Sequence, residues 1–201
     1  MDDTHTADSH RAHHDPSRVV CVGDGLVGAD GASLVLERLC RLHEPEKAWK
    51  FWHQGEAGCT SERLRSEAVW RAFGHDAGRM LVSLGGAELA RDPSDPARIA
   101  ASCKACMDVL ADKGPRLITL LLPCPSLWPS TVRPAAQALR QELSKADSRW
   151  ILVDVEPAAA AFVAAQAAHP DDATALVDEG PVLTPLGALL LAQEILRSWA
   201  T

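Results

Sequence analysis

Three glycine-rich segments, each directly after a short apolar run, carry the side chains that could do chemistry. The first contains Asp24, the second Cys59 and the third Glu88. A thiol acts as a nucleophile when a base takes its proton. Carboxylates bind divalent cations or transfer protons, and successive backbone N–H groups in a turn can hold an anion. These segments are therefore the candidate site.

Each of these side chains also has a structural interpretation. Cys59 needs a base, and His53 lies in the same segment, but a packed thiol and a surface imidazole are the commoner case. Asp24, Glu88 and Glu179 could bring three carboxylates together for a divalent cation or for acid–base work. Loop carboxylates are more often simply solvated, and an aspartate in a turn can bond its own backbone amides. We therefore expect no metal and no cofactor.

The cysteines and one tryptophan are also candidates. The chain has six cysteines and no apolar signal segment, so we expect reduced thiols. The pair Cys103 and Cys106 has C-x-x-C spacing but lies inside a helical pattern, which favours buried helix thiols over zinc or redox chemistry. Trp128 lies in the segment 125–134 after an apolar run. It could line a ligand cleft or a partner surface, although packing beneath the loop is favoured.

These segments sit between strands that alternate with helices. We expect strands at 19–22, 49–52, 80–84, 117–122 and 150–153, and helices at 32–43, 61–70, 96–113, 133–145, 157–168 and 185–199. Ser61 is the predicted N-cap of the second helix, and Thr184 with Pro185 begins the last. Apolar strands between helices predict a parallel sheet covered on both faces, with sites at the carboxyl ends of the strands.

Composition limits the function classes. The 201 residues include 47% hydrophobic and 23% charged residues with a net charge of −7, which suits one domain. No basic cluster indicates nucleic-acid binding, and no apolar run is long enough to span a membrane. Residues 1–17 are polar and carry four histidines, so we expect a disordered tail before a domain at 18–201. Weak metal affinity is the alternative for the tail. We expect a cytoplasmic protein.

Four segments, in order, resemble the sequence blocks of SGNH (GDSL-type) hydrolases. Residues 22–26 (VGDGL) are similar to the G-D-S-L block, and residues 53–61 (HQGEAGCTS) to N-x-G-x-x-G-x-T. Residues 84–88 (LGGAE) resemble G-x-N-D, and residues 179–187 (EGPVLTPLG) resemble D-x-x-H-L-T-P-x-G. The resemblance covers about residues 18–199. It implies a three-layer α/β/α, flavodoxin-like fold with a five-stranded parallel sheet; an unrelated flavodoxin-like domain is the alternative.

The resemblance also implies a loss of catalysis. Gly25 stands at the nucleophilic serine, Ala87 at the oxyanion-binding asparagine and Val182 at the general-base histidine, while Glu179 replaces the aspartate. Acyl transfer needs a nucleophile, a base and oxyanion donors, and only backbone donors such as the N–H of Gly58 remain.

The resemblance therefore predicts a pseudoenzyme that binds a protein partner or small ligand. From the composition, we expect it to bind neither nucleic acid nor a membrane. The expected binding residues lie on the strand-end loops: Asp24, Gly25, Gly58, Cys59, Glu88 and Trp128. One alternative is an active esterase with a rebuilt site, possibly using Cys59. Another is a purely structural interaction domain whose old pocket is filled.

Overall fold

A five-stranded, all-parallel sheet forms the centre of the computed structural model. The structure describes residues 15–66, 77–113, 115, 117–145, 150–167, 176–177 and 183–200. The strands lie in the order β2-β1-β3-β4-β5, and each neighbouring pair is parallel. Their bounds are β1 (Asp15–Gly28), β2 (Lys50–Gly55), β3 (Ala77–Ser83), β4 (Leu117–Leu121) and β5 (Trp150–Val153). This order is that of flavodoxin-like domains, so the predicted fold is confirmed.

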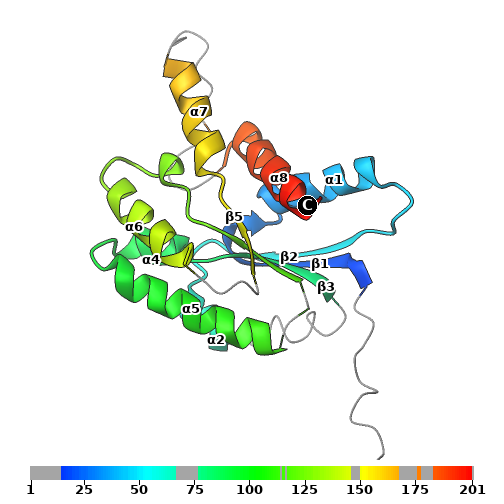
Figure 1. Cartoon of the computed structure of the whole chain (residues 1–201), viewed down its shortest axis with the longest axis horizontal. Coiled ribbons are helices and arrows are strands. Elements are labelled where there is room, and N and C mark those ends of the chain that lie inside the picture. The colour runs from blue at the N-terminus through cyan, green and yellow to red at the C-terminus, as the bar shows by residue number, and fades with distance from the viewer. Residues whose placement is uncertain are drawn as a thin grey trace, which may run out of the picture.

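Helices cover both faces of the sheet (Figure 1). One layer contains α1 (Ala32–His43) and α8 (Pro185–Trp199), which lie side by side, and the base of α7 (Glu156–Ala167). The opposite layer contains α2 (Ser61–Ser66), α4 (Gly86–Arg91), α5 (Pro96–Lys113) and α6 (Arg133–Leu143). A short 3-10 helix, η1 (Pro125–Leu127), follows β4, and α7 projects away from the sheet in Figure 1.

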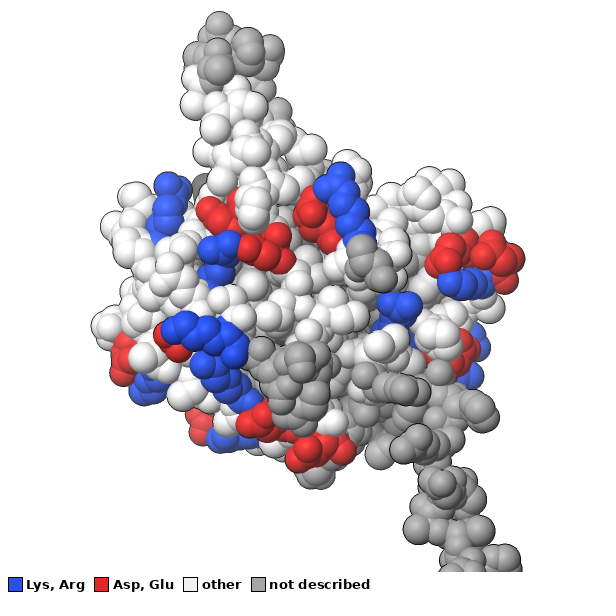
Figure 2. All heavy atoms as spheres, viewed as in Figure 1, with Lys and Arg blue, Asp and Glu red and all other residues white. Residues whose placement is uncertain are grey.

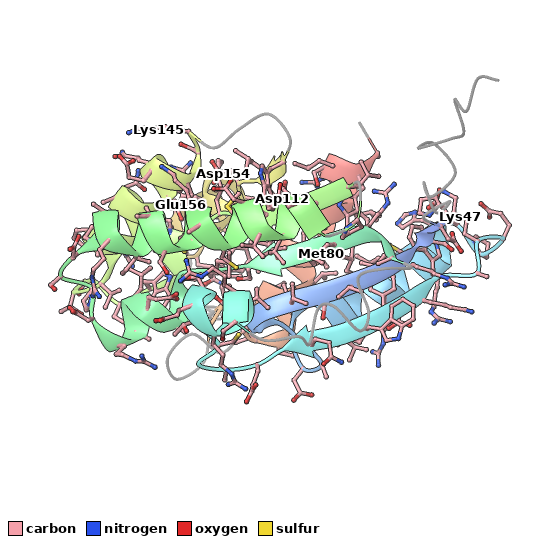
Figure 3. The ribbon with its side chains drawn as sticks, turned by 90° about the horizontal axis from the view of Figure 1, so that it is seen from below. Lys47, Met80, Asp112, Lys145, Asp154 and Glu156 are labelled. Atoms are coloured by element: carbon pink, nitrogen blue, oxygen red, sulfur yellow. The ribbon has the colours of Figure 1, made fainter. Side chains whose placement is uncertain are left out.

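The alternation of side chains along each strand produces two hydrophobic cores. On β1, Val20 and Val22 face the α2/α5/α6 layer, whereas Val19 and Cys21 face the α1/α8 layer. All four residues are fully buried, as expected for a central strand of a parallel sheet. Figure 3 shows α5 lying across the sheet with Met80 of β3 beneath it. The sheet therefore holds its strand-end loops in fixed positions.

Several element boundaries differ from the sequence prediction, and side chains explain two of the differences. β1 begins at Asp15 rather than at Val19, and Ser17 donates its N–H and hydroxyl to Asp15 Oδ1. The rest of the predicted tail, residues 1–14, lies outside the described residues. Thr60 rather than Ser61 caps α2, because Thr60 Oγ1 accepts the N–H of Arg63 at 3.2 Å. The predicted extension of α2 to residue 70 also lies outside the described residues.

Other local predictions are confirmed. Thr184 Oγ1 accepts the N–H of Gly187 at the start of α8, and Pro185 is the first helical residue. All six cysteines are buried and none forms a disulfide. Cys103 and Cys106 both lie inside α5, where burial raises the pKa of Cys106 to about 12.

Within the described ranges, no helix combines the length and apolar character that crossing a bilayer requires. Figure 2 shows acidic and basic side chains interspersed over the visible face. Helix α7 consists mainly of alanine and has Glu156, its first residue, as its one charged residue.

Candidate functional site

The loops that follow β1, β2 and β3 meet at the carboxyl edge of the sheet, as predicted. The loop after β2 lies beside the end of β1, because a Cβ built on Gly25 would be 3.6 Å from Ala57 Cα. The loop after β3 contacts the same region, where the Gly86 N–H donates to the Asp24 carboxylate. Ala87 follows in the first turn of α4. The structure thus brings together the segments of the first three sequence blocks.

Gly25 is exposed and has room for a side chain. The contact of its built Cβ with Ala57 is an ordinary van der Waals distance, and its φ is not in the left-handed region. Gly23, two residues earlier, is different. At φ 121° its Cβ would lie 1.8 Å from the carbonyl oxygen of Ser83. Local backbone geometry therefore requires glycine at Gly23 but does not explain the missing hydroxyl at Gly25.

Asp24 holds two loops together. Its carboxylate accepts the N–H of Leu26 at 3.1 Å, the N–H of Gly86 and the hydroxyl of Ser83. Burial raises its pKa above the ordinary value, against the effect of these hydrogen bonds. The turn interpretation of Asp24 is therefore confirmed for Leu26, and the side chain also reaches across to the loop after β3.

Glu88 connects three helices. Its Oε1 accepts both the N–H (2.7 Å) and the hydroxyl (2.6 Å) of Ser61 on α2, and Ser61 Oγ lies 2.8 Å from Ser102 Oγ on α5. Its Oε2 is buried without a hydrogen-bond partner among the described residues. No group of three His, Cys, Asp or Glu side chains in the described part of the chain is arranged to hold a metal ion.

Cys59 is the packed thiol that the sequence favours, and it does not form the alternative nucleophile–base pair with His53. Cys59 is 6% exposed and packs in the core on the α2/α5 side of the sheet. His53 shares strand parity with Phe51, which packs in the opposite core, and the two rings stack with centroids 5.9 Å apart. The imidazole therefore faces α1, away from the thiol, and this part of the rebuilt-site hypothesis is wrong.

His53 instead belongs to a serine–histidine–glutamate chain that the sequence analysis missed. Its Nδ1 lies 2.7 Å from Ser33 Oγ, and its Nε2 lies 2.9 Å from Glu37 Oε2. The available signal was the i, i+4 spacing of Ser33 and Glu37 on α1. Ser33 is fully buried, and its hydroxyl also lies 2.9 Å from the Val27 carbonyl. An enclosed hydroxyl of this kind cannot approach a carbonyl substrate. The hydrogen bonds among Ser33, His53 and Glu37 therefore have a structural role, which is to fix α1 to β1 and β2.

A second thiol at this edge is also poorly suited to nucleophilic chemistry. Cys124 Sγ donates to Glu156 Oε2 at 3.2 Å, and the same carboxylate accepts the N–H and hydroxyl of Ser126. Burial, followed by the hydrogen bond to Glu156, raises the pKa of Cys124 well above its ordinary value. A thiol that stays protonated is a weak nucleophile. Figure 3 shows Glu156 near Asp154, whose Oδ1 accepts Arg140 Nε at 2.9 Å.

The hollow between Asp24, Gly86 and the segment after β4 is nearly filled. The hollow that Asp24 and Gly86 line has a volume of only about 20 Å³, which is the space of a single water molecule. Trp128 closes it from the segment after β4, with Cζ2 3.8 Å from a Cβ built on Gly86. Trp128 also packs against the α2/α5/α6 core. The structure therefore favours packing of Trp128 beneath the loop, while its contact with a partner stays a prediction.

The last sequence block is described only in part. Glu179 and Val182, the predicted orienter and base positions, lie outside the described residues. On either side of them, Val177 and Leu183 form an isolated antiparallel bridge, and the N–H of Thr184 donates to the carbonyl of Leu176. The roles of Glu179 and Val182 stay predictions.

Comparison with known proteins gives the fold. No protein-family model and no curated protein matches this sequence. Among solved structures, an acetylxylan esterase from Geobacillus stearothermophilus matches with a TM-score of 0.73 and 16% identity over 92% of this chain and 94% of that chain. An alpha/beta hydrolase enzyme from the metagenome of Lake Arreo, Spain, matches with a TM-score of 0.69 and 17% identity over 91% and 94%.

A variant of the same esterase, described as a catalytic mutant with serine replaced by alanine, matches with a TM-score of 0.69 and 15% identity over 90% and 93%. Identities this low support a statement about fold and not about activity. The chain therefore has the alpha/beta fold of these hydrolases over nearly its whole length.

Proposed function

We propose that this protein is an SGNH-hydrolase-like domain that does not hydrolyse esters and acts by binding. The observation that carries the proposal is Gly25, which is exposed at the carboxyl edge, in a position with space for a serine side chain but without one. Acyl transfer in this fold needs a nucleophile at that point. Its absence, together with Ala87 at the expected oxyanion donor, removes the family mechanism.

The closed cleft supports the filled-pocket form of this proposal. A hollow of about 20 Å³ does not admit an ester substrate, and Trp128 and Asp24 both occupy the edge where one would bind. A protein partner or small ligand would then bind at the outer surface of the loops, or elsewhere on the domain. We place the protein in the cytoplasm, since none of its six cysteines forms a disulfide.

A second candidate function is an active hydrolase that uses a relocated nucleophile. The observation in its favour is the Ser33–His53–Glu37 chain, whose hydrogen bonds resemble those of a catalytic triad. The complete burial of Ser33 argues against it. Cys59 lacks His53 as a base, so it is the weaker alternative nucleophile.

One set of assays separates these candidates. Hydrolysis of 4-nitrophenyl acetate is measured for the unmodified protein and for Gly25→Ala, Ser33→Ala and Cys59→Ala, together with labelling by a serine-directed fluorophosphonate. We expect the unmodified protein to hydrolyse the ester no faster than Gly25→Ala, and we expect no labelled peptide. Turnover well above that control and lost in Ser33→Ala or Cys59→Ala would establish the active hydrolase and defeat the proposal.

A further inference from the structure

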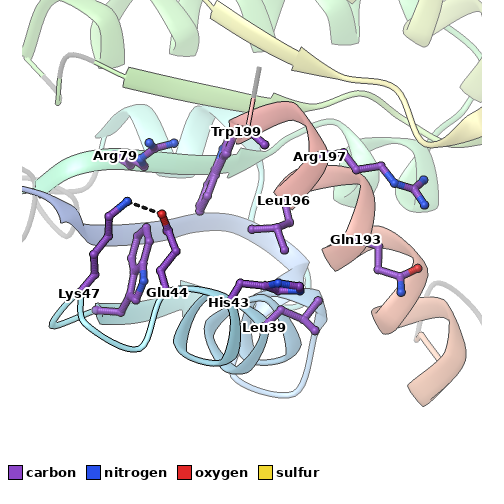
Figure 4. Close-up of a pocket in the computed structure, with 11 residues that line it drawn as sticks. Leu39, His43, Glu44, Lys47, Arg79, Gln193, Leu196, Arg197 and Trp199 are labelled. Carbon is purple, nitrogen blue, oxygen red and sulfur yellow. Dashed lines mark hydrogen bonds and ion pairs between the residues drawn. The ribbon is translucent and has the colours of Figure 1, made fainter.

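A large hollow among the described residues lies at the opposite edge of the sheet from the strand-end loops. This cavity of about 520 Å³ opens between the C-terminal ends of α1 and α8 and the starts of β2 and β3 (Figure 4). Small-molecule sites commonly have volumes of about 300–1,000 Å³. Leu39 of α1 and Leu196 of α8 give it apolar walls. It is thus large enough for a ligand, which the hollow of about 20 Å³ lined by Asp24 and Gly86 is not.

Arg79 of β3 contributes a cation to this cavity without an anionic partner. Its Nε is buried and has no hydrogen-bond partner among the described residues; the charge of Glu44 acts on the guanidinium electrostatically, but no ion pair joins the two. Burial lowers the pKa of the guanidinium, which records the cost of removing its charge from water. Guanidinium groups stay protonated in proteins. A buried charge of this kind is stabilised when an anion meets it.

The other charged groups around the cavity are largely compensated. Lys47 Nζ lies 2.5 Å from Glu44 Oε1, as the dashed line in Figure 4 marks, and Arg197 pairs with Glu194. His43, also on the lining, adds charge only when it is protonated. Arg79 forms no ion pair with a described carboxylate and is affected only by the more distant charge of Glu44, so it is the cation in this cavity best placed to meet a ligand with one negative charge.

Two indole rings supply flat walls. Trp199 reaches into the space between Arg79 and Leu196 in Figure 4, and its Nε1 donates to Thr119 Oγ1 at 2.9 Å, which fixes the ring. The Arg79 guanidinium lies over this ring, 4.9 Å from its centroid. Trp49 is the second wall, with Lys47 Nζ 5.6 Å from its ring centroid. Rings fixed before binding lose little entropy when a planar ligand packs against them.

The ends of α1 and α8 limit where an anion can sit. Both helices end at the cavity, and helix C-termini carry partial negative charge. Glu44, which is paired with Lys47, lies on the same side. The negative group of a ligand is therefore favoured at Arg79, with its apolar body toward Leu39 and Leu196.

We propose that this cavity binds a small aromatic carboxylate, whose ring lies against the indole walls and whose carboxylate meets the Arg79 guanidinium. The planar guanidinium matches a carboxylate through two parallel N–H···O bonds. The proposal is independent of ester hydrolysis, because the cavity and Gly25 lie at opposite edges of the sheet. Ester turnover would therefore leave it unchanged.

The test measures binding of three probes by isothermal titration calorimetry. We expect saturable binding of 2-naphthoate, binding of the neutral 2-naphthamide weaker by at least about tenfold, and no measurable binding of acetate. Arg79→Gln should weaken 2-naphthoate binding by at least about tenfold. Arg197→Gln is the matched control: it lies on the same rim, is already paired with Glu194, and should change the Kd by less than about twofold.

A second variant keeps the test decisive if Arg79→Gln does not fold. Leu196→Trp adds bulk at a half-buried position on the cavity wall and should abolish 2-naphthoate binding while the circular dichroism spectrum stays unchanged. Absence of saturable 2-naphthoate binding at millimolar concentration would overturn the proposal. Undiminished binding in folded Arg79→Gln or in folded Leu196→Trp would overturn it as well.

Discussion

The Asp24 carboxylate accepts the backbone N–H of Gly86, and its Oδ2 lies 2.4 Å from the point where a Cβ on Gly86 would stand. Asp24 lies near the end of β1, and Gly86 is the first residue of α4, which follows β3. Their contact leaves no room for a side chain at Gly86, so this edge of the sheet is closed by a buried carboxylate. A buried ionisable carboxyl makes the free energy of unfolding of the domain depend on pH.

The free energy of unfolding of the Asp24→Asn variant should increase relative to that of the unmodified protein as pH rises. Burial raises the pKa of Asp24 in the folded protein, whereas the unfolded chain has an ordinary value of about 3.9. Between these two values the folded state binds more protons, so the stability of the unmodified protein falls with rising pH through that interval. Asparagine does not titrate, so the stability of the variant does not fall through this pH interval. Urea unfolding of both proteins between about pH 4 and pH 8 measures the difference.

Asp92→Asn is the control for this experiment. Hydrogen bonds from Ser94 lower the pKa of Asp92, so its stabilising effect is present above the unfolded pKa and is lost as pH falls. The stability difference for Asp92→Asn should therefore change with pH in the opposite direction. A pH-independent difference for Asp24→Asn, or one of the same sign as for Asp92→Asn, would contradict the assigned shift.

Gly23→Ala and Gly25→Ala should have very different effects on stability. A Cβ at Gly23 would collide with the backbone of Ser83, and its φ of 121° is unfavourable for other residues. We expect Gly23→Ala to cost about 3 kcal/mol or more, because backbone atoms have to move. Gly25→Ala meets only an ordinary contact and should cost less than about 1 kcal/mol. Thermal unfolding of the two variants compares them directly, and equal destabilisation would show that the β1 end is arranged differently.

Glu88→Ala should destabilise the domain through Ser61. The change removes the acceptor of two short hydrogen bonds and leaves the Ser61 N–H near the start of α2 without its side-chain partner. The expected cost is about 1–3 kcal/mol. Glu62→Ala, an exposed glutamate on the same helix, is the control and should change stability by no more than about 0.5 kcal/mol. Chemical denaturation measures both, and similar values for the two variants would show that the Ser61 contact contributes nothing.

The fold was predictable because its signals are local. Apolar runs such as residues 19–22 and 150–153, bounded by turn residues and separated by helical patterns, gave strand positions close to those observed. The N-cap at Thr184 was predictable for the same reason. The first residues of β1 were missed because Asp15 and Ser17 are polar, and their place in the strand depends on each other's hydrogen bonds and on pairing with β3.

The side-chain chemistry of the edge was less predictable because it depends on which face of the sheet each residue occupies. His53 and Cys59 are close in sequence, yet the register of β2 directs the imidazole toward α1 while the thiol packs toward α5. The filling of the cleft by Trp128 depends on a contact with Gly86, more than 40 residues earlier in the chain. The Arg79 cavity is formed by four separate elements, and no single segment of sequence carries its pattern.

The last prediction asks whether restoring three family side chains restores catalysis. The triple variant Gly25→Ser, Ala87→Asn and Val182→His should fold, since the added Cβ at Gly25 meets only an ordinary contact. We expect no useful esterase activity from it. The neighbouring hollow, which Asp24, Gly86 and Trp128 line, is only about 20 Å³ and has no space for an acyl group. Glu179 is also one methylene longer than the family's aspartate, and a displacement of about 1 Å at the base costs on the order of 100-fold in rate.

The variant is checked by circular dichroism and then assayed with 4-nitrophenyl acetate and a serine-directed phosphonate. A quadruple variant that also carries Trp128→Ala is the matched comparison, because the fourth change opens the hollow without adding a catalytic group. Labelling at residue 25 only in the quadruple variant would identify cleft closure as the barrier to the nucleophile. Stoichiometric labelling or robust turnover in the triple variant itself would contradict the prediction. The edge would then be a preserved catalytic frame that lacks only three side chains, and Trp128 would have to move aside when a substrate binds.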